Sequence, residues 1–425
     1  MYNRITILAA PVISGTLLAL PWLGQSSFFS LFAFVPLWMH IFSKNDHQVN
    51  HPHRKTLSVV CTFFIWNVLT TGWISKATWA GAIIAIGINT LLMALLTEAV
   101  RIFTQKRSLP IRLLLFSSAW IVFEYLHHRW ELAWPWLTLG NAWATQPTLI
   151  QWYEFTGVLG GSAWILLTNG LITAWILNVT NESASRPNLQ IVAVLAVILL
   201  PLAVSLWMFQ THKSTSTPSL RVAILQPNID PYTEKFQEGT QLAQLDSILN
   251  LAIDASQQQP QIFIGPETAL SGIWENKIDS DPQVQQIRFF LQNHAPHAYF
   301  TIGAITYKRY TNTDTLPEYT RLNREQNFRY NVYNSALTIS REKETQTTHK
   351  EKLVAGVEKM PWISSIPFLE KWILDLGGTT GTLGNDNFQT THLGPNGHAF
   401  ATPICYESAF GAHCSALLSS KGEFM

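Results

Sequence analysis

The stretch LQIVAVLAVILLPLAVSLWMF, residues 189–209, contains no charged side chain and is long enough to cross a lipid bilayer as a helix. Further apolar runs precede it, separated by short polar loops. Together they predict an α-helical transmembrane bundle in the first half of the chain. The seven predicted spans are residues 5–22, 28–42, 57–74, 77–100, 113–126, 159–177 and 189–209.

The composition indicates a membrane domain followed by a domain in water. Hydrophobic residues make up 47% of the 425 residues and charged residues only 13%, and the charges are spread throughout the sequence only beyond residue 210. The Ser- and Thr-rich stretch at 211–219 predicts a short linker. We therefore expect a transmembrane helical domain at 1–210 and a second domain at 220–425.

The charge and the cysteine content exclude several function classes. The net charge is +1, and no basic patch with interleaved aromatic residues is present, so we expect no nucleic-acid partner. The three cysteines, Cys61, Cys405 and Cys414, have no CxxC spacing and predict neither a zinc site nor a disulfide framework. Any sulfur chemistry is therefore chemistry of a single thiol.

Lysine and arginine in the polar loops predict the orientation in the membrane, because they lie preferentially on the cytoplasmic side. With the N-terminus inside, seven crossings bring the second domain to the outer side. The outer segments then carry only Lys76 and Arg129. The inner segments carry Arg4, Lys44, Arg54, Lys55, Arg101, Lys106, Arg107, Arg112 and Arg186.

Other polar and aromatic residues of the membrane half have ordinary interpretations. Glu98 and Glu124 fall near helix ends, where we expect them to reach water. Four tryptophans lie between residues 127 and 143 on the outer side. They predict an aromatic belt at the membrane interface or, alternatively, part of a substrate entrance.

Beyond residue 220 the pattern alternates between strands and helices. Apolar runs predict strands at 221–228, 262–267, 298–307 and 332–340. Helical spacing of apolar residues predicts helices at 235–255 and 284–293. The alternation predicts an α/β domain in which helices cover sheets.

Three polar residues interrupt this pattern and have the chemistry of acyl transfer. Glu267 ends the apolar strand IFIGPE, Lys350 lies in THKEKLVAGVEKMP, and Cys405 ends the predicted strand FATPICYE. In acyl transfer a thiolate attacks a carbonyl, a carboxylate moves the proton, and a cation stabilises the negative oxygen. A nearby lysine also favours the thiolate.

Each of the three residues also has a simpler interpretation. Free cysteine is among the most buried residue types, so Cys405 by itself would be predicted in the core. A single glutamate at a strand end, or a lysine between histidine and glutamate, is usually a solvated surface charge. Taken one at a time, the residues leave both interpretations open.

Three segments resemble, in order along the chain, the Glu, Lys and Cys motifs of the nitrilase superfamily: GPETAL, HKEKLVAGVE and PICYESAFG. Joined to a membrane half, and with QPNI, WPWLTLGN and YNSA elsewhere, they resemble the apolipoprotein N-acyltransferase family. The resemblance implies a nitrilase-like αββα sandwich, with Glu267 as general base, Lys350 as oxyanion stabiliser and Cys405 as nucleophile. It also implies supporting roles for Glu358, Tyr406 and Glu407.

The resemblance further implies a reaction and a location. Cys405 would take an acyl chain from a membrane phospholipid as a thioester and pass it to the N-terminal amine of the diacylglyceryl-cysteine of an apolipoprotein, the last step of lipoprotein maturation. No metal, nucleotide or other cofactor is expected, and the protein is expected to be a monomer. It would lie in the bacterial inner membrane with its catalytic domain on the periplasmic side.

The sequence departs from the family's pattern in two places. Residues 355–357 are Ala, Gly and Val where the family usually has Pro, Phe and Gly. The chain stops at KGEFM, where the family continues with further strands and a last transmembrane helix, so we expect a C-terminally incomplete sandwich. Two alternatives therefore stay open: a membrane-tethered amidase of nitrilase type, and an inactive fragment that binds lipid or lipoprotein.

Overall fold

The chain divides into two compact units, residues Met1–Ser214 and Thr215–Met425, in the computed structural model. The residues that the structure describes are 2–42, 52–180, 187–212, 219–230, 234–235, 239–311, 316–317, 320–359, 382–385, 391–419 and 422–425. Most of the predicted linker at 211–219 lies outside these ranges, as do Lys44 and Arg186, which the predicted orientation uses.

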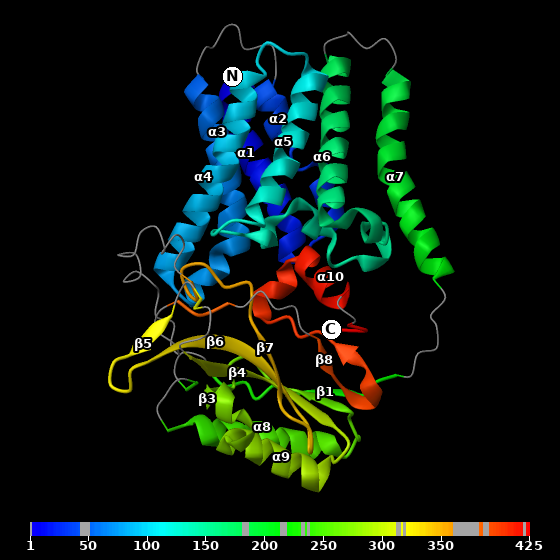
Figure 1. The fold of residues 1–425 in the computed structure, drawn as a ribbon. Helices are drawn as coiled ribbons and strands as arrows, with labels where there is room; N and C mark the ends of the chain where they lie inside the picture. The colour runs from blue at the N-terminus through cyan, green and yellow to red at the C-terminus, as the bar shows by residue number, and fades with distance from the viewer. Residues whose placement is uncertain are drawn as a thin grey trace. The chain divides into compact units, whose positions relative to one another are not determined.

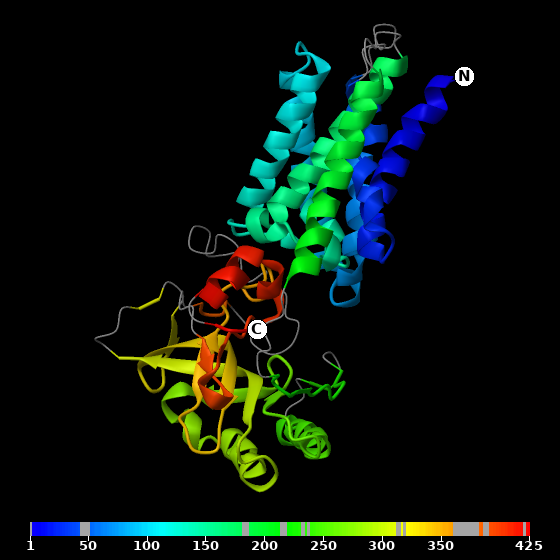
Figure 2. The ribbon, with the colours of Figure 1, turned by 90° about the vertical axis from the view of Figure 1, so that its right-hand side faces the viewer.

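The first unit is built from helices that run side by side (Figures 1 and 2). Each predicted span is largely helical, and five of the described helices are long and apolar enough to cross a membrane. The apolar helices at Ala9–Leu23 and Ser27–Phe42 are shorter. The unit therefore fits a multi-pass membrane protein, while the count of seven crossings stays a prediction. The helices are α1 (Tyr2–Ala19), α2 (Val35–Phe42), α3 (Pro52–Thr71), α4 (Trp79–Phe103), α5 (Leu109–His127), α6 (Tyr153–Thr180) and α7 (Pro187–Thr211).

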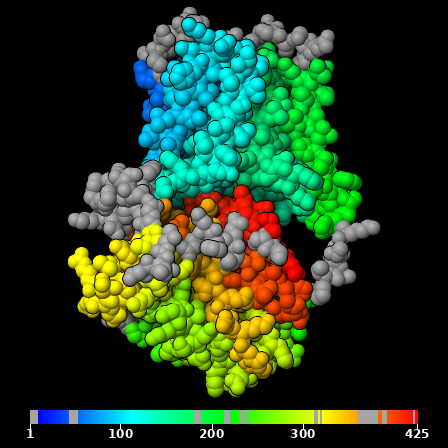
Figure 3. Space-filling view, viewed as in Figure 1, coloured from blue at the N-terminus to red at the C-terminus, as the bar shows by residue number. Residues whose placement is uncertain are grey.

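Aromatic side chains fill the interior of this unit, and apolar side chains also cover its outside. Trp38, Trp66 and Phe116 are fully buried, and the rings of Trp38 and Phe116 pack edge to face with centroids 5.0 Å apart. On α7, the green helix at the edge of the bundle in Figures 1 and 3, Leu200 is 64% and Trp207 is 65% exposed. A helix that is apolar all round suits a lipid environment, because lipid covers the outer face.

Glu98 and Glu124, the two glutamates near helix ends, both have partners within the membrane unit, and the prediction that Glu124 reaches water is wrong. Glu124 is only 4% exposed; it accepts hydrogen bonds from Trp120 Nε1 at 2.9 Å and from the backbone N–H of Leu139 at 2.8 Å. The loop after α5 folds back over the helix end and removes this carboxylate from solvent. Glu98 forms an ion pair with Arg101.

The second unit contains a mixed sheet. The order is β1-β2-β4-β6-β5, with β3 paired to the carboxyl half of β4 and β7 paired to β6. Strands β1, β2 and β4 are parallel, and β4 and β6 are antiparallel. The strands are β1 (Val222–Ile224), β2 (Ile262–Ile264), β3 (Leu270–Trp274), β4 (Tyr299–Tyr310), β5 (Arg321–Asn323), β6 (Phe328–Ile339) and β7 (Gln346–His349).

Helices α8 (Gln241–Ser256) and α9 (Pro282–His294) cover one face of this sheet, as Figure 1 shows. Their apolar stripes meet alternate residues of the strands. Phe263 and Phe300 are register partners on β2 and β4, both are fully buried, and their rings stack with centroids 5.7 Å apart. The helix predicted from residue 235 begins only at Gln241, because Gly239 has a φ of +82° and interrupts the helical backbone.

The part of the second unit that carries Cys405 differs from the predicted strand. Strands β8 (His392–Leu393) and β9 (Ala399–Phe400) form a two-stranded sheet, and the chain from Ala401 to Ile404 is not a strand. Pro403 has no backbone N–H and cannot continue a ladder of hydrogen bonds. A short 3₁₀ turn (Cys405–Ala409) and α10 (Gly411–Ser419) follow. A mixed sheet with helices is present, while the αββα sandwich stays a prediction.

Candidate functional site

Glu267 lies in a turn that follows β2 and rests directly on β4. Gly265 N donates to Thr301 O at 2.8 Å, and Ala269 N donates to Gly303 O at 2.9 Å, so both ends of the turn are fixed to the neighbouring strand. A Cβ atom on Gly303 would lie 2.5 Å from Glu267 Cα. Glycine at this position therefore allows the turn that carries Glu267 to pack close to the sheet.

Lys350 follows β7 and is buried between two carboxylates. It is 1% exposed, and its Nζ lies 2.8 Å from Glu358 Oε1 and 3.1 Å from Glu267 Oε1. A buried ammonium is costly unless it is paired and hydrogen-bonded, and these carboxylates supply both kinds of contact. The turn at 354–359, in which Gly356 has a φ of +78°, returns Glu358 to Lys350.

Asn334 joins the two carboxylates and was not predicted from the sequence. Its Nδ2 donates to Glu267 Oε1 at 2.7 Å and to Glu358 Oε1 at 3.0 Å, and its backbone oxygen accepts the N–H of Lys350 at 2.8 Å. Asparagine is depleted in strands, and Asn334 lies in the middle of β6, where it is 2% exposed. An asparagine inside a strand-forming run is the sequence signal that could have pointed to Asn334, although Asn331 of the same strand shares it.

Cys405 stands at the first position of the 3₁₀ turn and is exposed, so the interpretation as a buried core residue is wrong. Its backbone φ is +50°, a conformation that is uncommon for residues other than glycine and that clusters at functional sites. The Glu267 carboxylate acts on its thiol and raises the pKa of the thiol. The charges of Lys350 and Glu358 also act on this thiol.

The two residues after Cys405 are buried and hold the turn in place. The Glu407 carboxylate accepts the backbone N–H groups of Ile404 at 2.8 Å and of Glu351 at 2.7 Å. It thereby connects the chain beside Lys350 to the chain beside Cys405. Tyr406 is 4% exposed and packs edge to face on Phe410, with ring centroids 4.8 Å apart.

The electrostatics give the three central residues defined protonation states at neutral pH. Although burial alone would raise the pKa of Glu267, Lys350 and Asn334 lower it below its usual value. Burial lowers the pKa of Lys350, but the nearby carboxylates raise it above its usual value. Although Cys405 is exposed as a residue, the surrounding site partly desolvates its sulfur. This desolvation and the negative charge of Glu267 raise the pKa of the thiol by more than Lys350 lowers it. The site therefore holds a protonated thiol against an ionised carboxylate beside an ammonium.

The structure thus brings Glu267, Lys350, Cys405 and Glu358 into one cluster, with Asn334 between the carboxylates. Glu407 does not belong to the group of atoms around the Lys350 ammonium; it fixes backbone next to it. Such a cluster can transfer the thiol proton to the carboxylate, use the sulfur as a nucleophile and stabilise a negatively charged oxygen.

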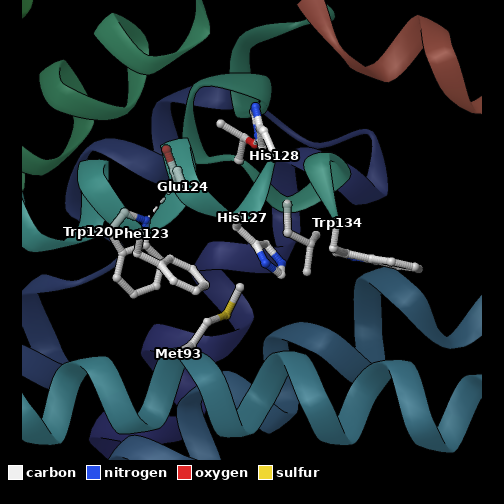
Figure 4. Close-up of a pocket in the computed structure, with 9 residues that line it drawn as sticks. Met93, Trp120, Phe123, Glu124, His127, His128 and Trp134 are labelled. Atoms are coloured by element: carbon white, nitrogen blue, oxygen red, sulfur yellow. Dashed lines mark hydrogen bonds between the residues drawn. The ribbon is translucent and has the colours of Figure 1, made fainter. Parts of the chain in front are cut away.

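A cavity in the membrane unit is too small for an acyl chain (Figure 4). Its volume is about 10 Å³, room for about one water molecule. Several of its polar side chains are paired; for example, His127 Nδ1 accepts the Trp130 Nε1–H at 2.8 Å. Trp143, predicted as part of an interfacial belt, is fully buried and donates to Ser30 Oγ at 3.1 Å. This region fastens the loop after α5.

The apolar helices and the Cys–Glu–Lys cluster define the class: a multi-pass membrane protein with a thiol, carboxylate and ammonium site in its second unit. A family model described as the apolipoprotein N-acyltransferase N-terminal domain matches residues 14–171, which lie in the membrane unit. This match and the two relatives below support the apolipoprotein N-acyltransferase family and an N-acyltransferase enzyme.

Two curated relatives carry that family name. The apolipoprotein N-acyltransferase of Chlorobaculum tepidum is 22% identical over 408 residues, which cover 92% of this chain and 72% of the relative. The apolipoprotein N-acyltransferase of Geobacter metallireducens is 28% identical over 240 residues, which cover 54% of this chain and 45% of that relative. The first similarity extends over both units of the chain.

Proposed function

We propose that the chain transfers an acyl chain from a membrane phospholipid, through a thioester on Cys405, to the N-terminal amine of a diacylglyceryl-cysteine in an apolipoprotein. The observation that carries the proposal is the contact of the Glu267 carboxylate with the buried Lys350 ammonium at 3.1 Å, since both of these charges act on the exposed Cys405 thiol. The family of the chain supports the acceptor class.

In the first step Cys405 Sγ attacks the carbonyl carbon of the phospholipid ester. Because the pKa of the thiol is raised, the thiol is protonated at neutral pH, and Glu267 takes its proton as the sulfur–carbon bond forms. The ester carbon–oxygen bond then breaks, and Glu267 returns the proton to the leaving oxygen of the lysophospholipid. Lys350 lies beside Glu267 and carries the positive charge for the oxyanion of the tetrahedral intermediate.

In the second step the amine of the lipoprotein attacks the thioester carbon. A carbon–nitrogen bond forms, the carbon–sulfur bond breaks, and the proton that the amine loses passes through Glu267 to the sulfur. The Asn334 amide bridges the Glu267 and Glu358 carboxylates, and Glu358 pairs with the Lys350 ammonium. Asn334 and Glu358 therefore hold the Glu267 carboxylate and the Lys350 ammonium in place during both steps. Tyr406 and Glu407 support the turn that presents Cys405.

The membrane unit gives this chemistry its location. Moving an acyl chain into water costs about 0.8 kcal/mol per CH₂ group, so a long chain reaches a thiol only at a bilayer surface. The bias of lysine and arginine in the polar loops supports a site on the periplasmic side of the bacterial inner membrane. We further propose a nitrilase-like sandwich for the second unit and a monomer that works without metal or other cofactor.

The test uses the full chain in phospholipid vesicles with a radiolabelled acyl chain. We expect a labelled thioester that hydroxylamine releases, that is absent from Cys405→Ser and that persists in the matched control Cys414→Ser. Adding a synthetic diacylglyceryl lipopeptide should move the label to its amine. A thioester that decays only to free fatty acid in the presence of the lipopeptide would support the amidase alternative, and no label on Cys405 would refute both reactions.

A further inference from the structure

A second lysine, Lys235, reaches the site from a distant part of the sequence. Its Nζ donates to the backbone oxygen of Glu267 at 2.9 Å and to Thr268 Oγ1 at 2.7 Å. The side chain is half-buried, and it precedes Gly239 and α8 in a stretch without regular structure. No pattern in the sequence singles it out, because it lies 32 residues before Glu267.

The two acceptors of Lys235 belong to the turn that presents the carboxylate. Thr268 has a φ of +51°, and a β-branched residue in this left-handed region is a conformational outlier. Such backbone persists only when its surroundings fix it. On one side the turn packs on Gly303, and on the other side the Lys235 ammonium binds the carbonyl of Glu267 and the hydroxyl of Thr268.

The charge of Lys235 also acts on the reacting groups. Burial lowers the pKa of Lys235, while the negative charges of Glu267 and of ionised Cys405 raise it. By reciprocity the Lys235 ammonium favours the ionised forms of the carboxylate and the thiol. Within the described residues the groups that face this thiol therefore comprise two cations, Lys235 and Lys350, and two carboxylates, Glu267 and Glu358.

We propose that Lys235 is a positioning residue for acyl transfer: its ammonium fastens the Glu267–Thr268 turn and supplies a second positive charge beside Cys405. The inference rests on the proposed function. The two lysines then have different tasks: Lys350 is enclosed between carboxylates, whereas Lys235 binds the backbone of Glu267, the general base. Lys235 holds the base through the backbone oxygen of Glu267 and the hydroxyl of Thr268, and its charge acts on Cys405.

The test measures the rate at which iodoacetamide alkylates Cys405 as a function of pH, by mass spectrometry of the full chain in vesicles. In Lys235→Met the midpoint of the pH profile should rise by about one unit, and alkylation at neutral pH should slow about tenfold. The limiting rate at high pH should stay unchanged, because access to the sulfur is unchanged. Lys235→Arg should keep the wild-type midpoint, and the exposed control Lys277→Met should match wild type.

A second variant tests the fastening of the turn. Thr268→Val keeps the shape and the charge but removes the hydroxyl acceptor, so we expect slower thioester formation with an unchanged alkylation midpoint. An unshifted midpoint in Lys235→Met would overturn the charge role, and normal thioester formation in Thr268→Val would overturn the fastening role. If Lys235→Met does not fold, Lys235→Gln gives the same decision on charge. Alkylation needs no acyl donor, so failure of this proposal is distinguishable from failure of the proposed function.

Discussion

Replacement of Glu267 by Gln is expected to lower the pKa of the Cys405 thiol. The same replacement is expected to abolish acyl transfer. The negative charge of Glu267 acts on the sulfur and raises the pKa of the thiol. Glutamine keeps the size and an acceptor oxygen but removes the charge. Lys350 then retains its ion pair with Glu358 and acts on the thiol with less opposition.

The size of the effect follows from the partners of the thiol. Desolvation of the sulfur by the surrounding site, which also raises the pKa of the thiol, is unchanged in the variant, so only the contribution of Glu267 is lost. A neighbouring charge at contact distance shifts a pKa by about one unit or more, which corresponds to about 1.4 kcal/mol. Alkylation of Cys405 at neutral pH should therefore become about tenfold faster, although thioester formation from phospholipid is lost.

The measurement compares the pH midpoint of alkylation in wild type and variant, with Cys414 in the same chain as the internal reference. The expected midpoint is lower in the variant, and the profile of the reference thiol is the same in both proteins. A midpoint that moves upward would refute the reasoning, because it would mean that Glu267 stabilises the resting thiolate. In that case the carboxylate would not be the group that takes the proton during attack.

Three further outcomes are expected. Asn334→Leu removes a hydrogen bond that lowers the pKa of the base, so the acid limb of the pH profile of thioester formation should move to higher pH. Gly140→Ala brings a Cβ atom within 2.1 Å of Val158 O and should destabilise the membrane unit by about 1–3 kcal/mol in thermal unfolding, whereas Gly87→Ala, with nothing within 4 Å, should be neutral or slightly stabilising. The pKa of Glu407 is lowered despite burial, so its contribution to the free energy of unfolding is present above pH 4.5 and is lost on acidification. Glu407→Gln should reduce the free energy of unfolding by about 2 kcal/mol at neutral pH and should make it fall less on acidification. Equal acid sensitivity of the two proteins would contradict this prediction.

Much of the local structure could be predicted from residue patterns. The strand predictions at 262–267 and 332–340 overlap β2 and β6, and the helix prediction at 284–293 lies within α9. These elements have regular apolar periodicity, which depends only on neighbours in the sequence. The strand predicted up to Cys405 is wrong beyond Phe400, because Pro403 and the left-handed backbone of Cys405 do not continue the ladder of hydrogen bonds.

By itself, the sequence determined that this protein has apolar helices followed by a mixed α/β unit, and it identified the thiol, carboxylate and ammonium as candidates. Only the tertiary structure decided that Asn334 bridges two carboxylates, that Lys235 holds the turn of the base, and that Glu124 is buried. Periodicity records which face of one element is apolar. Contacts between residues far apart in the chain depend instead on strand register and on how turns pack, and no local pattern records either.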